Sequence, residues 1–119
     1  MAMLPIVTTD MRVLLANEPR AYREVIAAAL QARRRHVDVV AVEPAGLDGA
    51  VARLAPHLVV CSRPPEAVPV GPLAWVVLYP GGAPQAVVSI AGHRTTVEGI
   101  DFDGLLAIVD RTERLAQMS

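Results

Sequence analysis

Lysine is absent from this chain of 119 residues, and cysteine and aromatic residues are scarce. A single cysteine excludes an intramolecular disulfide and is typical of a reducing compartment. One tryptophan, one phenylalanine and two tyrosines argue against a platform on which single-stranded bases stack. The net charge is −1, with 11 arginines against 12 acidic residues, so we expect no binding to nucleic acid.

A long uninterrupted apolar run is also missing, although 53% of the residues are hydrophobic. The uncharged stretch from Ala67 to Ser89 is broken by proline or glycine at seven positions. A membrane-spanning helix needs about 20 continuous apolar residues. The N-terminus shows neither the cationic segment nor the apolar core of a signal peptide. We therefore expect a cytoplasmic protein that does not bind membranes.

The length predicts one α/β domain over residues 1–119, because a chain of this size can bury a core without disulfides or metals. Residues 1–10 have no periodic apolar pattern and are expected to form a flexible arm. Residues 62–74 are expected to form a proline-rich loop, since each proline inside a helix costs about 3 kcal/mol.

Before Ser62 the apolar pattern predicts strand, helix, strand, helix and strand in turn. We expect strands over 11–16, 36–42 and 58–61, and a short helix over 47–54. The first helix begins after Pro19, and its expected buried face comprises Tyr22, Val25, Ile26, Ala29 and Leu30. This alternation is the opening of a doubly wound α/β fold.

Beyond Ser62, prolines and short links replace the expected helices. Strands are predicted over 75–79, 85–91 and 94–100, the last two forming an antiparallel hairpin around Gly92-His93. A parallel crossover needs a dozen or more residues, which the link after Tyr79 does not supply. The third and fourth helices should therefore be missing. Asp101 should cap a last helix with a buried face of Phe102, Leu105, Leu106 and Val109.

Two segments, Arg12-Val13-Leu14-Leu15-Ala16-Asn17-Glu18-Pro19 and Pro56-His57-Leu58-Val59-Val60-Cys61-Ser62, resemble the response-regulator receiver domain. The resemblance covers residues 12–62 and 101–115 and implies a flavodoxin-like doubly wound sheet of parallel strands, here with an antiparallel hairpin at one edge. It also implies that Ala16 and Asn17 replace the acids that hold Mg²⁺, and that Ser62 replaces the phosphorylated aspartate. The required lysine is missing, so the chain resembles a degenerate receiver, or pseudo-receiver.

The resemblance implies a non-catalytic regulatory module that docks to proteins in a signalling pathway, with no cofactor and no metal. The alternative is a small-ligand sensor. Its pocket would lie at the carboxyl edge of the sheet, where α/β folds usually bind ligands. The candidate pocket residues are Asn17, Glu18, Ser62 and Tyr79.

The missing helices predict an open apolar sheet face, and large exposed apolar patches mark interaction sites. Twofold dimers are the commonest oligomers, so we expect a homodimer that covers this face. The alternative is that the proline-rich loop covers it. The candidate interface residues are Trp75, Val76, Val77, Val87 and Val88.

Cysteine or histidine chemistry is a third possibility. Cys61 lies at a strand end, but no general base is visible beside it, which favours a packed thiol over a nucleophile. The three histidines, His36, His57 and His93, fall at separate element boundaries without the spacing of metal ligands. We therefore expect neither a metal site nor an enzyme.

Overall fold

The computed structural model describes residues 11–63, 71–78 and 84–118. Predicted features within residues 1–10, 64–70 and 79–83 therefore lie outside the described residues. No helix in the described ranges is long and apolar enough to cross a membrane. The elements, in chain order, are β1 (Arg12–Ala16), α1 (Arg20–Arg33), β2 (Asp38–Ala41), the 3₁₀ helix η1 (Pro44–Gly46), α2 (Leu47–Leu54), β3 (Leu58–Cys61), β4 (Ala74–Leu78), β5 (Gln85–Ile90), β6 (His93–Glu98) and α3 (Phe102–Gln117).

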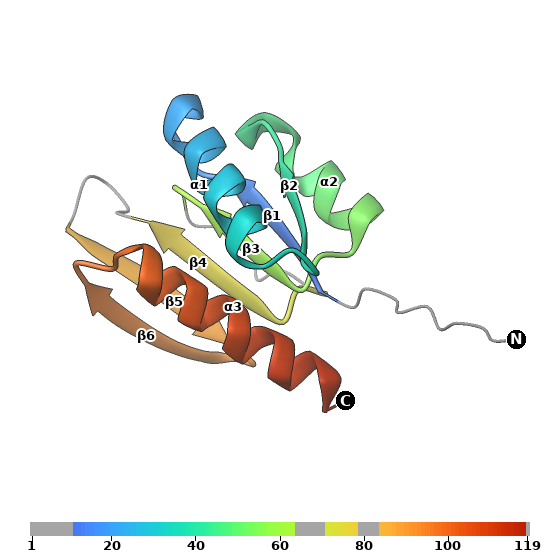
Figure 1. Cartoon of the computed structure of the whole chain (residues 1–119), viewed down its shortest axis with the longest axis vertical. Helices are drawn as coiled ribbons and strands as arrows, with labels where there is room; N and C mark the ends of the chain where they lie inside the picture. The colour runs from blue at the N-terminus through green and yellow to red at the C-terminus, as the bar shows by residue number, and fades with distance from the viewer. Residues whose placement is uncertain (1–10, 64–70, 79–83, 119) are drawn as a thin grey trace, which may run out of the picture.

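One mixed sheet of six strands, in the order β2-β1-β3-β4-β5-β6, forms the centre of the molecule (Figure 1). Neighbours from β2 to β4 pair in parallel, while β5 pairs antiparallel with both β4 and β6. The predicted hairpin is confirmed, with its turn one residue earlier than expected, at Ala91-Gly92. Both residues have positive φ, 51° and 86°, as a tight two-residue hairpin turn requires.

The predicted fold class, a flavodoxin-like doubly wound sheet, is wrong. The sheet is mixed, and the described residues contain three α-helices. A doubly wound sheet needs a helical crossover between successive parallel strands. The links 79–84 and 91–92 are too short for one, so the chain reverses twice instead. The receiver-like pattern of the first half of the chain does not predict how the strands of the second half are connected.

The helices cover the two sheet faces unequally. Helices α1 and α3 lie on one face, where Ile26, Leu30, Leu105 and Val109 pack with strand residues such as Val76. The other face has a smaller cluster, in which α2 packs against the sheet. Its buried members are Leu14, Ala50, Val59, Cys61, Trp75 and Val77.

The predicted open apolar face is not found along β4 and β5. Val76 and Val88 belong to the core beneath α1 and α3, with 0% and 4% of their surface exposed. On the opposite face Trp75 and Val77 are 9% and 6% exposed. Only Val87 of the five predicted interface residues is half-buried. Whether the proline-rich loop covers Trp75 concerns residues outside the described ranges.

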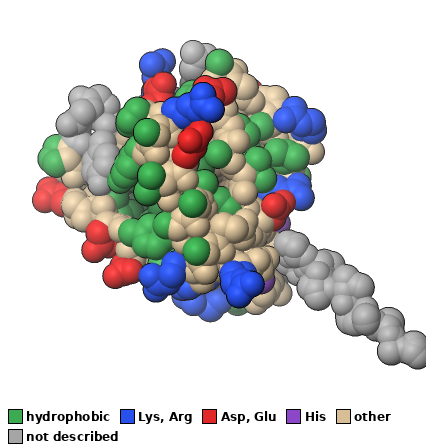
Figure 2. All heavy atoms as spheres, turned by 45° about the horizontal axis from the view of Figure 1, so that its top comes forward, with side chains coloured by type: hydrophobic (Ala, Val, Ile, Leu, Met, Phe, Trp, Pro, Cys, Tyr) green, Lys and Arg blue, Asp and Glu red, His purple; other side chains and the backbone are tan. Residues whose placement is uncertain are grey.

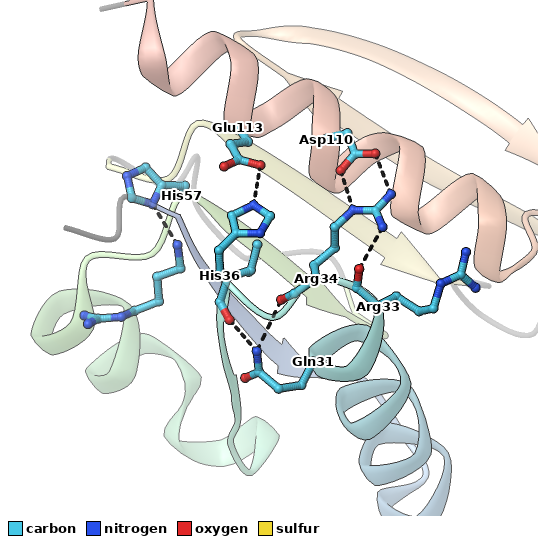
Figure 3. A network of polar contacts seen from close by, with 9 residues as sticks. Gln31, Arg33, Arg34, His36, His57, Asp110 and Glu113 are labelled. Carbon is cyan, nitrogen blue, oxygen red and sulfur yellow. Dashed lines mark hydrogen bonds and ion pairs between the residues drawn. The ribbon is translucent and has the colours of Figure 1, made fainter. Parts of the chain in front are cut away.

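Polar contacts hold α3 against the end of α1 (Figure 3). The Arg34 guanidinium donates two hydrogen bonds to the Asp110 carboxylate, at 2.7 and 2.8 Å. One turn further along α3, Glu113 lies 3.0 Å from Nε2 of His36. The hydrogen bond from Arg34 lowers the pKa of the Asp110 carboxyl below its ordinary value. At the other end of α3, Asp101 caps the helix as predicted, accepting from the Gly104 amide at 2.8 Å.

Replacement of Asp110 by asparagine should lower the thermal midpoint modestly at neutral pH, because the pair is partly exposed and screened by salt. Since the folded-state pKa is depressed, the carboxylate stabilises the fold above its unfolded pKa of about 3.9. That stabilisation is lost as the pH falls through the folded-state pKa. Circular dichroism melts of both proteins should therefore converge on acidification. Equal midpoints at pH 7 would contradict the assignment.

Candidate functional site

The carboxyl ends of β1 and β3 bring two predicted pocket residues together. Ala16 is the register partner of Cys61 in the parallel pair, so Asn17 and Ser62 follow at the same edge of the sheet. Both strands are buried, which fixes the positions from which these residues leave the core. Tyr79, the fourth predicted pocket residue, lies outside the described residues.

Ser62 joins the end of β3 to the loop between β1 and α1. Its Oγ accepts a hydrogen bond from the backbone amide of Glu18 at 2.8 Å. The Glu18 carboxylate is 3.9 Å from the guanidinium of Arg63, and the two side chains are 48% and 84% exposed. Such a long contact between exposed side chains contributes little to the stability of the fold. Glu18 and Ser62 therefore lie close together, but the contact is made by the backbone amide of Glu18 and not by its carboxylate.

Asn17 is fully buried, with 0% of its surface exposed. Neither Oδ1 nor Nδ2 has a hydrogen-bond partner among the described residues. A buried amide left without partners costs about 1–3 kcal/mol. The Asn17 side chain is therefore a buried polar group of this edge whose burial no hydrogen bond within the described residues offsets.

Arg23 is a buried residue of this edge that the sequence analysis missed. Its side chain is 4% exposed, and the guanidinium donates to the Asn17 carbonyl at 3.3 Å and to the Glu43 carboxylate at 3.1 Å. It thereby ties α1 to the loop after β1 and to the segment after β2. An arginine can take this place because its five donors satisfy several acceptors from one buried plane.

The predicted buried face of α1 is correspondingly wrong in part. Tyr22 and Val25 are 44% and 65% exposed, whereas Arg23, Ile26 and Leu30 are buried. The signal was present, because these three buried residues have i, i+3, i+7 spacing. Apolar residues alone define the predicted face, because a charged side chain such as Arg23 is rarely buried unless it is paired.

An apolar pocket of about 200 Å³ lies between α1 and α3 near the end of β4. Figure 2 shows hydrophobic side chains gathered among charged ones on the side toward the viewer. The exposed members of the pocket wall include Tyr22 and Val25. The complete lining is Tyr22, Val25, Ile26, Ala29, Leu78, Ile100, Asp101, Phe102 and Leu105.

Cys61 is a packed thiol at the end of β3. It is 3% exposed, and its Sγ donates to the carbonyl of Arg63 at 3.2 Å. Burial raises the pKa of the Cys61 thiol to about 11, so the neutral thiol prevails at pH 7. The thiolate, which is the nucleophilic form, is scarce.

Two of the histidines, His36 and His57, make contacts away from this edge. His57 Nδ1 accepts from the Arg12 amide at 3.0 Å, and His36 contacts Glu113 (Figure 3). Within the described ranges no group of three or more His, Cys, Asp or Glu residues is placed to hold a metal ion. The hydrogen bonds at the carboxyl edge that involve Ser62 and Arg23 join loops of the chain to one another.

A scan against protein-family models and a search of curated proteins both find no match for this chain.

Replacement of Arg23 by alanine should lower the free energy of unfolding by about 1–3 kcal/mol, since the Asn17 carbonyl loses a donor and the core loses the alkyl stem. Arg20 on the same helix supplies a matched control, because its side chain is 73% exposed and pairs with Glu24. Arg20→Ala should leave the urea midpoint nearly unchanged. Equal effects of the two variants would contradict the buried role of Arg23.

Cys61 should react slowly with thiol reagents in the native protein at pH 7, because the thiol is buried and protonated. Urea should raise the rate to that of a free thiol. Modification followed by mass spectrometry gives both rates on one sample. Rapid native labelling would show an accessible thiolate and restore Cys61 as a candidate nucleophile.

Proposed function

We propose that this chain is a non-catalytic regulatory module, similar to a receiver domain whose phosphoacceptor site has been lost, and that it acts by docking to another protein chain. The observation that carries the proposal is the set of residues at the carboxyl edge and the hydrogen bond that Ser62 makes there. Ser62 stands where a receiver has its aspartate, and its hydroxyl holds the Glu18 amide at 2.8 Å. Ala16 and Asn17 stand where the receiver's acids would be.

The contacts around this edge favour a structural use of its polar groups. Arg23 connects α1 to the Asn17 carbonyl and to Glu43, so the loops are held by the chain itself. Receiver chemistry needs a carboxylate nucleophile and oxygen ligands for Mg²⁺. A serine hydroxyl and an uncharged amide supply no carboxylate, either as the nucleophile or as a charged ligand for Mg²⁺. A module with this edge transmits a signal through what it binds.

A small-ligand sensor is the second candidate, and the unpartnered amide of Asn17 favours it. A ligand with one donor and one acceptor would satisfy Oδ1 and Nδ2 together. Because Asn17 is fully buried, such a ligand would have to displace chain that covers the amide. That displacement costs free energy, which is why we place docking first.

Incubation with acetyl phosphate and Mg²⁺ should leave the mass of the protein unchanged. The physical reason is that Ala16, Asn17 and Ser62 provide no carboxylate to accept phosphate or to hold the metal. Intact-mass spectrometry is the measurement, and a phosphorylatable receiver treated alongside is the positive control. A Mg²⁺-dependent adduct on this chain would refute the proposed loss of phosphotransfer.

A further inference from the structure

Strand β6 is an edge strand of the sheet that the described residues form. Among those residues it pairs only with β5, and all six of its residues are exposed. In Figure 1 it forms the border of the sheet, with α3 lying over the face beside it. Unpaired edges can template further strands unless proline, bulges or charged side chains, above all lysine, protect them, and the charged residues of β6 are Arg94 and Glu98. The sequence HRTTVE has no proline or lysine, and its register with β5 is continuous.

The direction of the free backbone groups follows from the β5–β6 ladder. The Gly99 amide donates to the Pro84 carbonyl at 3.2 Å, so Gly99 turns its backbone groups toward β5. Antiparallel strands alternate in this respect at every residue. The amides and carbonyls of Arg94, Thr96 and Glu98 therefore point away from β5, toward the open side of the sheet.

We infer that β6 pairs antiparallel with β6 of a second copy of this chain, about a twofold axis at Thr96. This register places Thr96 opposite Thr96 of the second copy, and Arg94 opposite its Glu98. Each of these pairs joins outward groups to outward groups, which gives about six backbone hydrogen bonds in three closely paired positions. The two sheets become one continuous sheet with twofold symmetry.

Charge selects this register and this partner. Residues directly opposite on one sheet face interact, and opposite charges there are favourable while like charges are not. With the axis at Thr96, both Arg94 side chains meet a Glu98 of the other copy. An axis at Thr95 would instead put Arg94 opposite Thr96, and an axis at Val97 would put Glu98 opposite Thr96. The strand is self-complementary in charge about Thr96, from which Arg94 and Glu98 are each two residues away.

The opposite edge of the sheet does not offer the same surface. Strand β2 has four residues, and the side chain of Asp38 at its start is held by Arg12 at 2.7 Å. Val42, Glu43 and Pro44 follow it, and proline ends further pairing. An isologous dimer closes when one strand pairs with itself, so the β6 edge alone forms a closed pair and not a filament.

This inference rests on the proposed function in naming the partner of a docking module, but it moves the interface from the β4–β5 face to the β6 edge. Strand pairing makes a small interface, at the weak end of specific association. Helix α3 of each copy would lie on the same side of the joined sheet. The apolar pocket between α1 and α3 stays free in this arrangement.

Sedimentation of the whole chain over about 1–500 µM should show a reversible monomer–dimer equilibrium. Arg94→Glu alone places Glu against Glu98 of the second copy, and Glu98→Arg alone places Arg against Arg94. Each single variant should weaken self-association about ten-fold or more, since two favourable pairs become two repulsive ones. An equimolar mixture of the two single variants should dimerise again, because opposite charges then face one another across the interface.

Two controls separate assembly from folding. Thr96→Pro removes an outward amide without breaking the β5 ladder and should give a folded monomer by circular dichroism. Val25→Glu, on the exposed wall of the α1–α3 pocket, should leave dimerisation unchanged. A wild-type monomer at every concentration, a mixture that fails to restore the dimer, or a dimer abolished by Val25→Glu would overturn the inference. None of these results would bear on phosphotransfer, which acetyl phosphate tests separately.

Discussion

The parallel pairing of β1 with β3, buried on both faces of the sheet, is the contact on which the other features depend. Its register sets Ala16 beside Cys61 and so brings Asn17 and Ser62 to one edge. Because both strands are inaccessible from either side, the groups that leave them are positioned by the core and not by the loops. The Ser62–Glu18 bond and the Arg23 contacts then hold the loops to this fixed edge.

Link length decides the rest of the architecture. The early links contain α1 and α2, which allows parallel crossovers, whereas the links after β4 and β5 force reversals. The second reversal places β6 at the edge of the sheet, and no later strand of the described residues pairs with it. A return helix, α3, then covers the sheet face on which α1 also lies. The short links that rule out a doubly wound sheet thus also leave β6 at an edge, where some of its backbone groups point away from the sheet formed by the described residues.

Local periodicity predicted most elements well, because short strands such as 58–61 and the Asp101 cap depend on neighbouring residues alone. The predictions that were wrong depended on contacts with residues far away in the sequence. The receiver-like pattern of residues 12–62 holds no information on how the second half closes the sheet. Trp75 was expected to be exposed for lack of a helix, but it is buried in the cluster to which Ala50 of α2 also belongs. The burial of Arg23 required knowing that Glu43 lies beside it.

The charge pattern of β6 illustrates the same separation between local and distant information. In the sequence, Arg94 and Glu98 are an ordinary pair four residues apart, of the kind that a helix also favours. Their meaning changes once the strand is known to be an edge and the parity of its amides is fixed by Gly99. Both charges then lie on outward-pairing positions, symmetric about Thr96. Like charges there would oppose self-pairing, whereas the opposite charges of Arg94 and Glu98 are compatible with the proposed pairing.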